Sequence, residues 1–337
     1  MFDEAVYQRA AEQALVNWTL DIDKLTLSSR SENVVYKVTT QSSDSYALRI
    51  HRPGYNSIEE LNSEVNWSQA LRESGVYVPK HILTRDGKHY AKVKLEPTKQ
   101  IHYVGLIEWL DGESLENLIK TSEKPQIKEY YFKLGELMAQ VHNQSASWNP
   151  PKSFTRRKWD ADGLMGDNPL WGRFWEVNEL AAEERSLLEA ARIRLHQEIS
   201  EFEKTPSTYG IIHADLHAAN VLVQGEKLQI IDFDDCGYSW HAYEIAVAET
   251  DASSKIKEDR ISSKEIRSAM IDGYNNLRPL TAATKNQLSV LTLVRQLISL
   301  GWANDRRELI SDEFFRPYIG NLCPIVESYL TDPKDQS

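Results

Sequence analysis

The sequence predicts an α+β protein in which a small, strand-rich lobe precedes a larger helical lobe. Short β-branched and aromatic runs gather in the first third of the chain, whereas most later stretches have apolar residues three and four positions apart. Strands followed by helices are typical of the α+β class, and 337 residues suffice for two lobes around one cleft. A crossing segment at 108–112 joins the two patterns, so we expect lobes at 1–110 and 111–337.

The first lobe contains the signals of a small sheet with one helix. Two β-branched or aromatic runs flank the polar turn at 41–44, which predicts a hairpin. Gly75 follows a helical pattern at the position of a C-terminal cap. The expected elements are strands at 22–27, 34–38, 46–50, 89–95 and 101–109, and a helix at 57–74.

The second lobe is predicted to be mainly helical. Its clearest helix has apolar or aromatic residues at 130, 131, 134, 137, 138 and 141, which lie on one helical face. One short strand-rich island interrupts the helical pattern. The expected elements are helices at 127–141, 181–202, 263–274 and 284–300, and the island at 210–233.

The composition excludes several classes of function. A net charge of −11 argues against nucleic-acid binding through a basic surface. No apolar run approaches the roughly 18 residues of a membrane span, and the first residues do not resemble a signal peptide. The two cysteines, Cys236 and Cys323, are too few for a disulfide framework or a metal cluster. We expect a cytoplasmic protein with no nucleic-acid or membrane partner.

Two segments of the sequence contain the candidate catalytic and metal-binding residues. His-Ala-Asp-Leu-His-Ala-Ala-Asn occupies 213–220, and an apolar strand that ends in Asp-Phe-Asp occupies 228–234. Phosphoryl transfer requires one carboxylate to accept the proton of the acceptor hydroxyl, and further oxygen ligands to hold Mg²⁺ against the phosphates. Asp215 is the candidate base, and Asn220 and Asp232 are the candidate ligands.

Each of these residues is uninformative by itself, because a loop Asp or Asn is usually a turn or cap residue. We assign His213 a structural role, because a buried His is more often a structural residue than a catalyst. Asp234 is either a further metal ligand or part of a solvated turn. The order, the spacing and the apolar flanks of the three candidates nevertheless agree, which chance seldom produces.

The chain here resembles the aminoglycoside phosphotransferase and choline kinase superfamily, within the protein-kinase-like fold. It is most similar to the branch that contains type II homoserine kinases and bacterial stress-response kinases. The resemblance runs from about residue 27 to residue 300. It implies that Asp215 is the catalytic base, and that Asn220 and Asp232 bind the metal that accompanies ATP.

The resemblance also implies a nucleotide site in the first lobe. Tyr-Ala-Leu-Arg at 46–49 stands where such kinases have Val-Ala-Ile-Lys, so Arg49 takes the position of the phosphate-binding Lys. Glu64 on the next helix is its preferred partner, with Glu59 and Glu60 as alternatives nearer the helix start.

The phosphate loop and the hinge are predicted less directly. Residues 28–33 fall where a Gly-rich loop would cover the phosphates, but they contain no glycine, so the candidates are Ser29 and Ser31. A plain polar turn is the alternative. By resemblance, backbone groups of Glu108 and Leu110 pair with the edge of the adenine.

Departures from the protein-kinase pattern bear on the acceptor. Ala214 stands where phosphorylation-regulated kinases have an Arg, and no long activation segment follows Asp232. Both features favour a small-molecule acceptor. The tryptophan-rich segment 148–175 is a candidate wall for that acceptor, with simple packing as the alternative. The acidic composition gives a slight preference for an acceptor that bears an amine.

The first hypothesis is therefore an ATP- and Mg²⁺-dependent kinase that phosphorylates a hydroxyl of a small amino alcohol, amino acid or sugar. The second is a bacterial stress-response Ser/Thr protein kinase. The third is a catalytically inactive nucleotide-binding scaffold, against which the intact set of Asp215, Asn220 and Asp232 argues.

Overall fold

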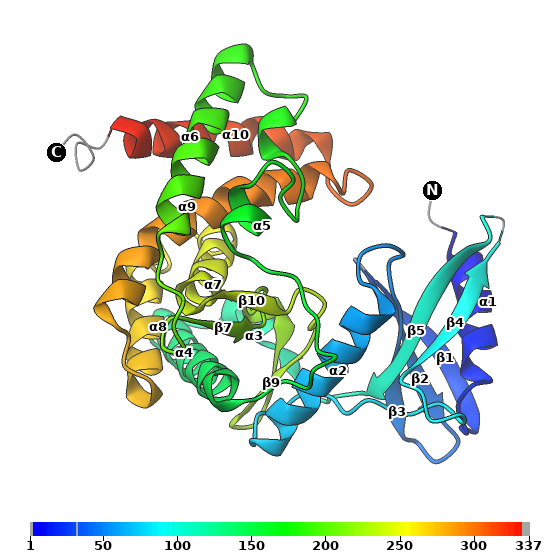
Figure 1. The fold of residues 1–337 in the computed structure, drawn as a ribbon. Coiled ribbons are helices and arrows are strands. Elements are labelled where there is room, and N and C mark those ends of the chain that lie inside the picture. Colours follow the sequence, from blue (N-terminus) through cyan, green and yellow to red (C-terminus); the bar gives the residue numbers. More distant parts are fainter. Residues whose placement is uncertain (1–2, 32, 97, 332–337) are drawn as a thin grey trace. The chain divides into compact units, whose positions relative to one another are not determined.

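A five-stranded antiparallel sheet forms the N-terminal part of the chain in the computed structural model, which describes residues 3–31, 33–96 and 98–331 (Figure 1). The spatial order is β1-β2-β3-β5-β4, and every neighbouring pair runs antiparallel. A register shift between Leu27 and Ser29 marks a bulge in the first strand. The strands are β1 (Ile22–Arg30), β2 (Val34–Thr40), β3 (Ser45–Ile50), β4 (Tyr90–Leu95) and β5 (Gln100–Glu108).

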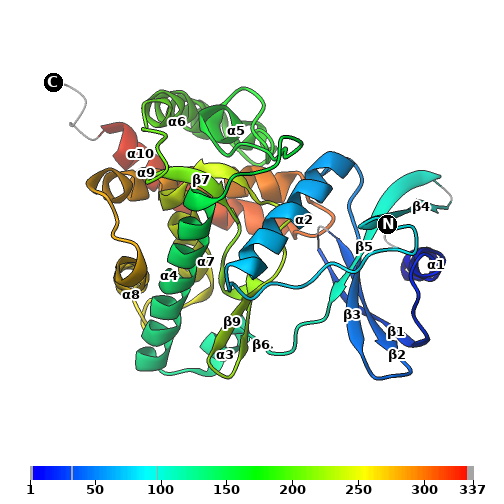
Figure 2. The same ribbon diagram turned by 60° about the horizontal axis from the view of Figure 1, so that its bottom comes forward.

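Two helices lie on opposite sides of this sheet, as Figures 1 and 2 show. α1 (Glu4–Leu15) begins at Asp3, whose carboxylate accepts hydrogen bonds from the first helical N–H groups. α2 (Ile58–Glu73) begins with a reciprocal capping box between Ser57 and Glu60. The main core fills the side of α1, where it consists of small residues of α1 and alternate residues of the strands. A smaller cluster beneath α2 contains Leu61, Val65 and Tyr90.

The chain divides into two compact units, and the first gathers distant segments of the sequence. It consists of Met1–Glu113, Trp148–Arg156 and Leu222–Asp234. The last segment includes most of β8 (Val221–Gln224) and all of β9 (Lys227–Ile230). The N–H of Ile230 donates to the carbonyl of Tyr77 at 2.8 Å, which ties this segment to the chain that follows α2.

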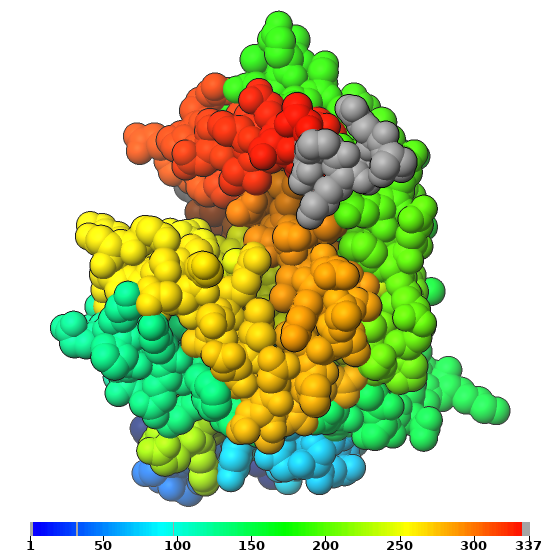
Figure 3. Space-filling view, turned by 90° about the vertical axis from the view of Figure 1, so that its left-hand side faces the viewer, coloured from blue at the N-terminus to red at the C-terminus, as the bar shows by residue number. Residues whose placement is uncertain are grey.

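The second unit consists of Ser114–Ser147, Arg157–Val221 and Asp235–Ser337 and is mainly helical. In Figure 3, α8, α9 and α10, coloured from yellow to red, occupy neighbouring parts of one face. A hairpin-like pair of short antiparallel strands, β7 (Tyr209–Ile212) and β10 (Gly237–Trp240), brackets the segment that contains Asp215. A further short strand, β6 (Glu113–Ser114), crosses the division between the units. The helices are α3 (Leu115–Thr121), α4 (Lys124–Ser147), α5 (Ala161–Met165), α6 (Ala182–Ser200), α7 (His241–Lys255), α8 (Ser263–Leu277), α9 (Ala282–Asn304) and α10 (Phe315–Thr331), with short 3₁₀ turns η1 (Phe174–Glu176), η2 (Ala218–Asn220) and η3 (Asp312–Phe314).

Glycines allow the closest helix contact in this unit, between α4 and α8. A Cβ atom added to Gly135 of α4 would lie 2.1 Å from the carbonyl oxygen of Met270. A Cβ atom added to Gly273 of α8 would lie 1.9 Å from the carbonyl oxygen of Phe132. Both distances are far below van der Waals contact, so the two backbones can approach only because these side chains are absent.

The α+β class predicted from the sequence is confirmed, with differences at the level of single elements. The strand predicted at 22–27 continues to Arg30, so Ser28 and Ser29 lie in β1 and not in a loop. The helices α1, α3, α5 and α10 were not predicted. Within the described part of the chain, no helix combines the length and the apolar character that a membrane span requires.

Candidate active site

Arg49 owes its orientation to strand alternation. Its neighbours in β3, Leu48 and Ile50, are buried in the core on the side of α1, so Arg49 points to the opposite side, towards α2. There its Nη1 lies 3.4 Å from Oε1 of Glu64, and both side chains are buried. Glu60 is engaged in the capping box of α2 instead. The geometry thus places Glu64, the preferred candidate, beside Arg49.

Two carboxylates that follow β9 also bind Arg49. Its Nη2 lies 2.7 Å from Oδ1 of Asp232 and 3.1 Å from Oδ1 of Asp234. The two carboxylates differ in accessibility, because the side chain of Asp232 is 39% exposed and that of Asp234 only 5%. Burial alone would raise the pKa of Asp234, but Arg49 and His51 outweigh this effect and hold that pKa below its ordinary value.

The segment 232–234 is fixed by groups from distant parts of the first unit. Nδ2 of Asn33 donates a hydrogen bond to Oδ2 of Asp234. Arg156 donates through Nη2 to the carbonyl of Asp234 at 2.6 Å, and Asn56 donates to the same carbonyl at 3.2 Å. Asp232 itself has a φ of 66°, which only a few non-glycine residues adopt, Asp among them. These contacts hold the exposed carboxylate of Asp232 in one place, and they assign Asp234 to the interior.

The catalytic-loop candidates lie together in the second unit. Nδ2 of Asn220 donates to Oδ2 of Asp215 at 3.1 Å and to its backbone carbonyl at 2.9 Å. Nε2 of His217 lies 3.2 Å from the same Oδ2. The amide orientation leaves Oδ1 of Asn220 without a hydrogen bond among the described residues, so an oxygen suited to Mg²⁺ is available there.

The charge of Asp215 is set by two neighbouring cations. Nη2 of Arg295, on α9, lies 2.9 Å from Oδ1 of Asp215. Burial would raise the pKa of Asp215, but His217 and Arg295 outweigh burial and hold this pKa well below its ordinary value. Conversely, the pKa of His217 is raised, because attraction to Asp215 exceeds the effect of burial. The candidate base therefore lies between two groups that favour its ionised form.

Sequence reasoning missed Glu244, which binds the backbone just before Asp215. It lies on α7, fully buried, and its Oε1 and Oε2 accept the N–H groups of His213 and Ala214, each at 2.8 Å. Burial raises its pKa to about 8 in spite of these bonds. Ala214 has a φ of 65°, a conformation that needs support in a residue with a side chain. His213 is also fully buried, which agrees with the structural role assigned to it.

The residues predicted for the phosphate loop lie in or just after the edge strand β1, and those predicted for the hinge lie at and after the end of the interior strand β5. Ser29 is an exposed residue of β1 that pairs with Val35, and Ser31 is an exposed turn residue. Glu108 ends β5, and its N–H already donates to the carbonyl of Lys80 at 2.8 Å. The N–H of Glu108 therefore already has an acceptor within the first unit. No described residue accepts a hydrogen bond from the N–H of Leu110.

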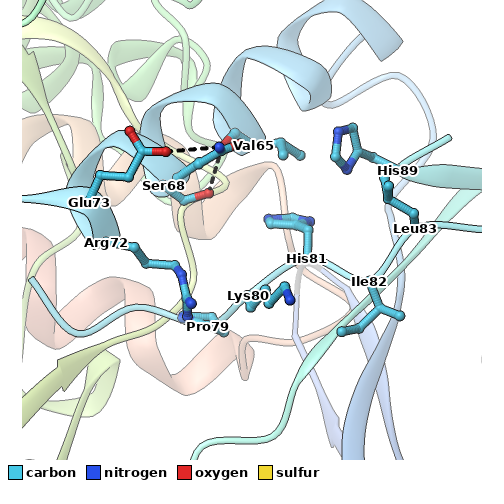
Figure 4. Close-up of a pocket in the computed structure, with 11 residues that line it drawn as sticks. Val65, Ser68, Arg72, Glu73, Pro79, Lys80, His81, Ile82, Leu83 and His89 are labelled. Carbon is cyan, nitrogen blue, oxygen red and sulfur yellow. Dashed lines mark hydrogen bonds between the residues drawn. The ribbon is translucent and has the colours of Figure 1, made fainter. Parts of the chain in front are cut away.

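A cavity of about 570 Å³ in the first unit lies elsewhere, between the C-terminal half of α2 and the segment 79–83 (Figure 4). None of the residues predicted to bind the nucleotide lines it. Arg72, in its wall, contacts Oε2 of Glu108 at 3.4 Å. The cavity is thus adjacent to the hinge without including it.

The tryptophan-rich segment 148–175 mostly packs the protein. Trp159, Trp171, Phe174 and Trp175 are all buried, and Trp159 contacts Trp171 edge to face. Trp240 and His241 are buried as well. The packing alternative therefore holds for most of these residues.

The family follows from comparison with known proteins. The family model described as the phosphotransferase enzyme family matches residues 25–280. The chain belongs to this family. It is a phosphotransferase of the small-molecule kinase type, and the resemblance and the kinase-like fold inferred from the sequence are confirmed.

Individual relatives and solved structures agree with this membership. A structure described as the microcompartment-associated aminopropanol kinase is 30% identical, with a TM-score of 0.80, and the match covers 97% of this chain and 98% of that one. A homoserine kinase of Methylobacillus flagellatus is 27% identical over 265 residues, which is 77% of this chain and 72% of the relative. The amicoumacin kinase hAmiN, in complex with AMP-PNP, Ca²⁺ and Ami, is 19% identical with a TM-score of 0.77 and coverage of 96% and 95%, which shows likeness of fold.

Proposed function

We propose that this enzyme transfers the γ-phosphoryl group of Mg²⁺-ATP to a hydroxyl group of a small molecule that also bears an amine. The supporting observation is the arrangement of Asp215 and Asn220. The amide N–H₂ of Asn220 holds the carboxylate, while its amide oxygen accepts no hydrogen bond from the residues that the structure describes. One residue pair thus provides an oriented proton acceptor and a hard metal ligand, which phosphoryl transfer needs side by side.

The nucleotide would occupy the first unit. Arg49, held by Glu64, would bind phosphate oxygens, and its buried guanidinium has few alternative positions. The carbonyl oxygen of Glu108 and the N–H of Leu110 would pair with the adenine edge. Ser29 and Ser31 are exposed near the turn between β1 and β2, where their hydroxyls are accessible to phosphates.

The donor chemistry of the chain suits Mg²⁺, which protein sites usually bind through one or two carboxylates together with substrate phosphates. Asp232 is the accessible carboxylate and Asn220 offers the amide oxygen. When bound, the ion neutralises charge on the transferring phosphoryl group. Asp215 accepts a hydrogen bond from the acceptor hydroxyl, directs its oxygen at the phosphorus and takes its proton.

The relatives support an acceptor that contains both a hydroxyl and an amine, because an aminopropanol kinase and a homoserine kinase share this feature by name. Ala214 supports a small acceptor over a protein, since it cannot bind the phosphate of an activation segment. The bacterial Ser/Thr protein kinase remains the second candidate. Both cysteines are unpaired and buried, in keeping with our expectation of a cytoplasmic protein.

An acceptor screen tests the proposal. The purified enzyme is given Mg²⁺-ATP with amino alcohols, hydroxy amino acids, sugars and a generic protein substrate, and mass spectrometry detects the gain of one phosphate. We expect one of the first two groups to be phosphorylated. Efficient phosphorylation of protein Ser or Thr, with every small molecule inert, would support the protein kinase instead.

The Asp215→Asn variant is the control for the role of the base. It preserves size and hydrogen bonding but removes the proton-accepting carboxylate, so kcat should fall about 10²–10⁴-fold with little change in ATP affinity. Near-normal turnover of this variant on the same acceptor would contradict the assignment of Asp215.

A further inference from the structure

Arg295 contacts the candidate base although it lies 80 residues away in the sequence. It is on α9, a helix that otherwise presents mainly apolar residues to the interior. Its Nη2 donates to Oδ1 of Asp215 at 2.9 Å, and its side chain is only 10% exposed. A buried charge is costly unless it has a partner, so its place next to Asp215 requires an explanation.

The guanidinium of Arg295 is held from two further directions. Its centre lies 4.4 Å from the centroid of the Trp171 ring, and its Nη1 is 3.5 Å from the hydroxyl of Tyr243. Trp171 is itself fixed by an edge-to-face contact with Trp159. The planar cation stacks on an aromatic face and leaves one edge for Asp215, an arrangement that suits Arg and does not suit Lys.

The two oxygens of Asp215 therefore have different partners. Oδ1 accepts from Arg295, whereas Oδ2 accepts from Asn220 and lies near His217. Asn220 and His217 belong to the same loop as Asp215, so they move with it. Arg295 is the contact that ties this carboxylate to a long helix of the second unit.

We infer that Arg295 is a positioning residue for phosphoryl transfer: by holding Oδ1, it aims Oδ2 of Asp215 at the acceptor hydroxyl. The inference rests on the proposed function, because it assigns Arg295 a role only through Asp215. A displacement of about 1 Å at a reacting group costs on the order of 10²-fold in rate, so the fixation of one carboxylate oxygen has a measurable value. The effect should appear in turnover and not in binding.

The first test compares Arg295→Gln and Arg295→Lys with the control Arg192→Gln. Arg192 also stacks on a tryptophan, with its guanidinium 4.6 Å from Trp175, and it also binds a carboxylate, that of Asp167 at 3.2 Å. It has no contact with Asp215. We expect Arg295→Gln to lower kcat by about 10²-fold, with the KM values for acceptor and Mg²⁺-ATP changed less than about threefold. Arg295→Lys should recover part of kcat, and Arg192→Gln should leave it unchanged.

The second test is a double-mutant cycle with Asp215→Asn. If Arg295 acts through Asp215, adding Arg295→Gln to Asp215→Asn causes little further loss, whereas an independent structural role makes the two losses multiply. Multiplying losses, or an unchanged kcat in Arg295→Gln, overturn the inference. Thermal melts check that each variant is folded. If Arg295→Gln does not fold, the same cycle with Arg295→Lys decides.

The two proposals fail in different ways. An Asp215→Asn enzyme with normal turnover contradicts the proposed role of the base, whatever Arg295 does. An inactive Asp215→Asn enzyme together with a fully active Arg295→Gln enzyme leaves the proposed function intact and removes Arg295 from it.

Discussion

Arg49 binds Asp232 at 2.7 Å, so the cation predicted to hold phosphates and the carboxylate predicted to hold Mg²⁺ are paired with each other. Each compensates the charge of the other in the absence of a nucleotide. Under the proposed function, both groups would gain a new partner of opposite charge on binding Mg²⁺-ATP, while Glu64 and Asp234 lie beside Arg49. We therefore propose that the pair holds both side chains in place before the nucleotide binds.

The two carboxylates beside Arg49 should behave differently on substitution. Asp232→Ala removes a partly exposed group, so the unliganded protein should keep nearly its full stability but lose the thermal stabilisation by Mg²⁺-ATP. Asp234→Asn breaks a buried ion pair and should lower the free energy of unfolding by about 3–5 kcal/mol. Thermal melts with and without Mg²⁺-ATP measure both effects. Unchanged protection by Mg²⁺-ATP in Asp232→Ala would move the metal site elsewhere.

Glu244 should make stability depend on pH. Its pKa rises from an ordinary value of 4.5 to about 8 in the folded protein, so between these values the folded state binds more protons than the unfolded state. Stability must then fall as the pH rises through this interval. Glu244→Gln cannot titrate, so the fall should be weaker in this variant. Denaturant unfolding from pH 5 to pH 8 tests this, and parallel pH profiles for the two proteins would contradict it.

The same substitution should also carry a cost that does not depend on pH. The N–H groups of His213 and Ala214 need two acceptors, and Gln offers only one oxygen. An unpaired buried donor costs about 1–3 kcal/mol, so Glu244→Gln should be less stable than the native protein even at pH 5.

The motif residues could be predicted from the sequence because they lie close together in it. Asp215 and Asn220 share one short segment, and Asp232 follows β9 a few residues later in the chain, so the three form a recognisable sequence pattern. Arg49 and Glu64 were predicted from the resemblance to the Val-Ala-Ile-Lys strand of kinases and the helix that follows it. Arg295 and Glu244 were missed because each meets the loop from another helix. The sequence did contain one sign of them, because each is a charged residue in a largely apolar helical stretch. An analysis of apolar spacing gives no weight to such single charged residues.

Three differences between the predicted and the observed fold have physical explanations as well. α1 buries Ala10, Ala11 and Ala14, whose small side chains produce no strong apolar stripe in the sequence. α10 contains Pro324, which normally indicates the end of a helix, yet the helix continues through it. The boundary of β1 was misplaced because serines are poor strand formers, and pairing with β2 across a bulge overrides that preference.

Two glycines offer a matched test of helix packing. Gly135→Ala in α4 would place a methyl group 2.1 Å from the carbonyl oxygen of Met270, so it should destabilise the protein by about 1–3 kcal/mol or more. Gly320 lies inside α10, and apart from its chain neighbours and the backbone of its own helix no atom lies within 4 Å of the position of a Cβ. Gly320→Ala should therefore stabilise the protein by about 0.4–1 kcal/mol. Denaturant unfolding should show opposite signs, and equal effects would contradict the close α4–α8 contact.

The enzyme should be active without phosphorylation. Phosphorylation-regulated kinases use an Arg beside the base to bind a phosphate, and this position is Ala214. The loop that contains Asp215 is held by contacts within the protein: Glu244 binds its backbone, and Arg295 binds Asp215 at 2.9 Å, in an arrangement that involves no phosphate.

A phosphatase experiment tests this expectation. Protein treated with a phosphatase, and then separated from it, should phosphorylate its small-molecule acceptor at the rate of untreated protein. Mass spectrometry before and after treatment shows whether any phosphate was present to remove. A large loss of kcat together with the loss of a phosphate would mean that a modified side chain supplies order that Glu244 and Arg295 do not, and it would favour the regulated protein kinase.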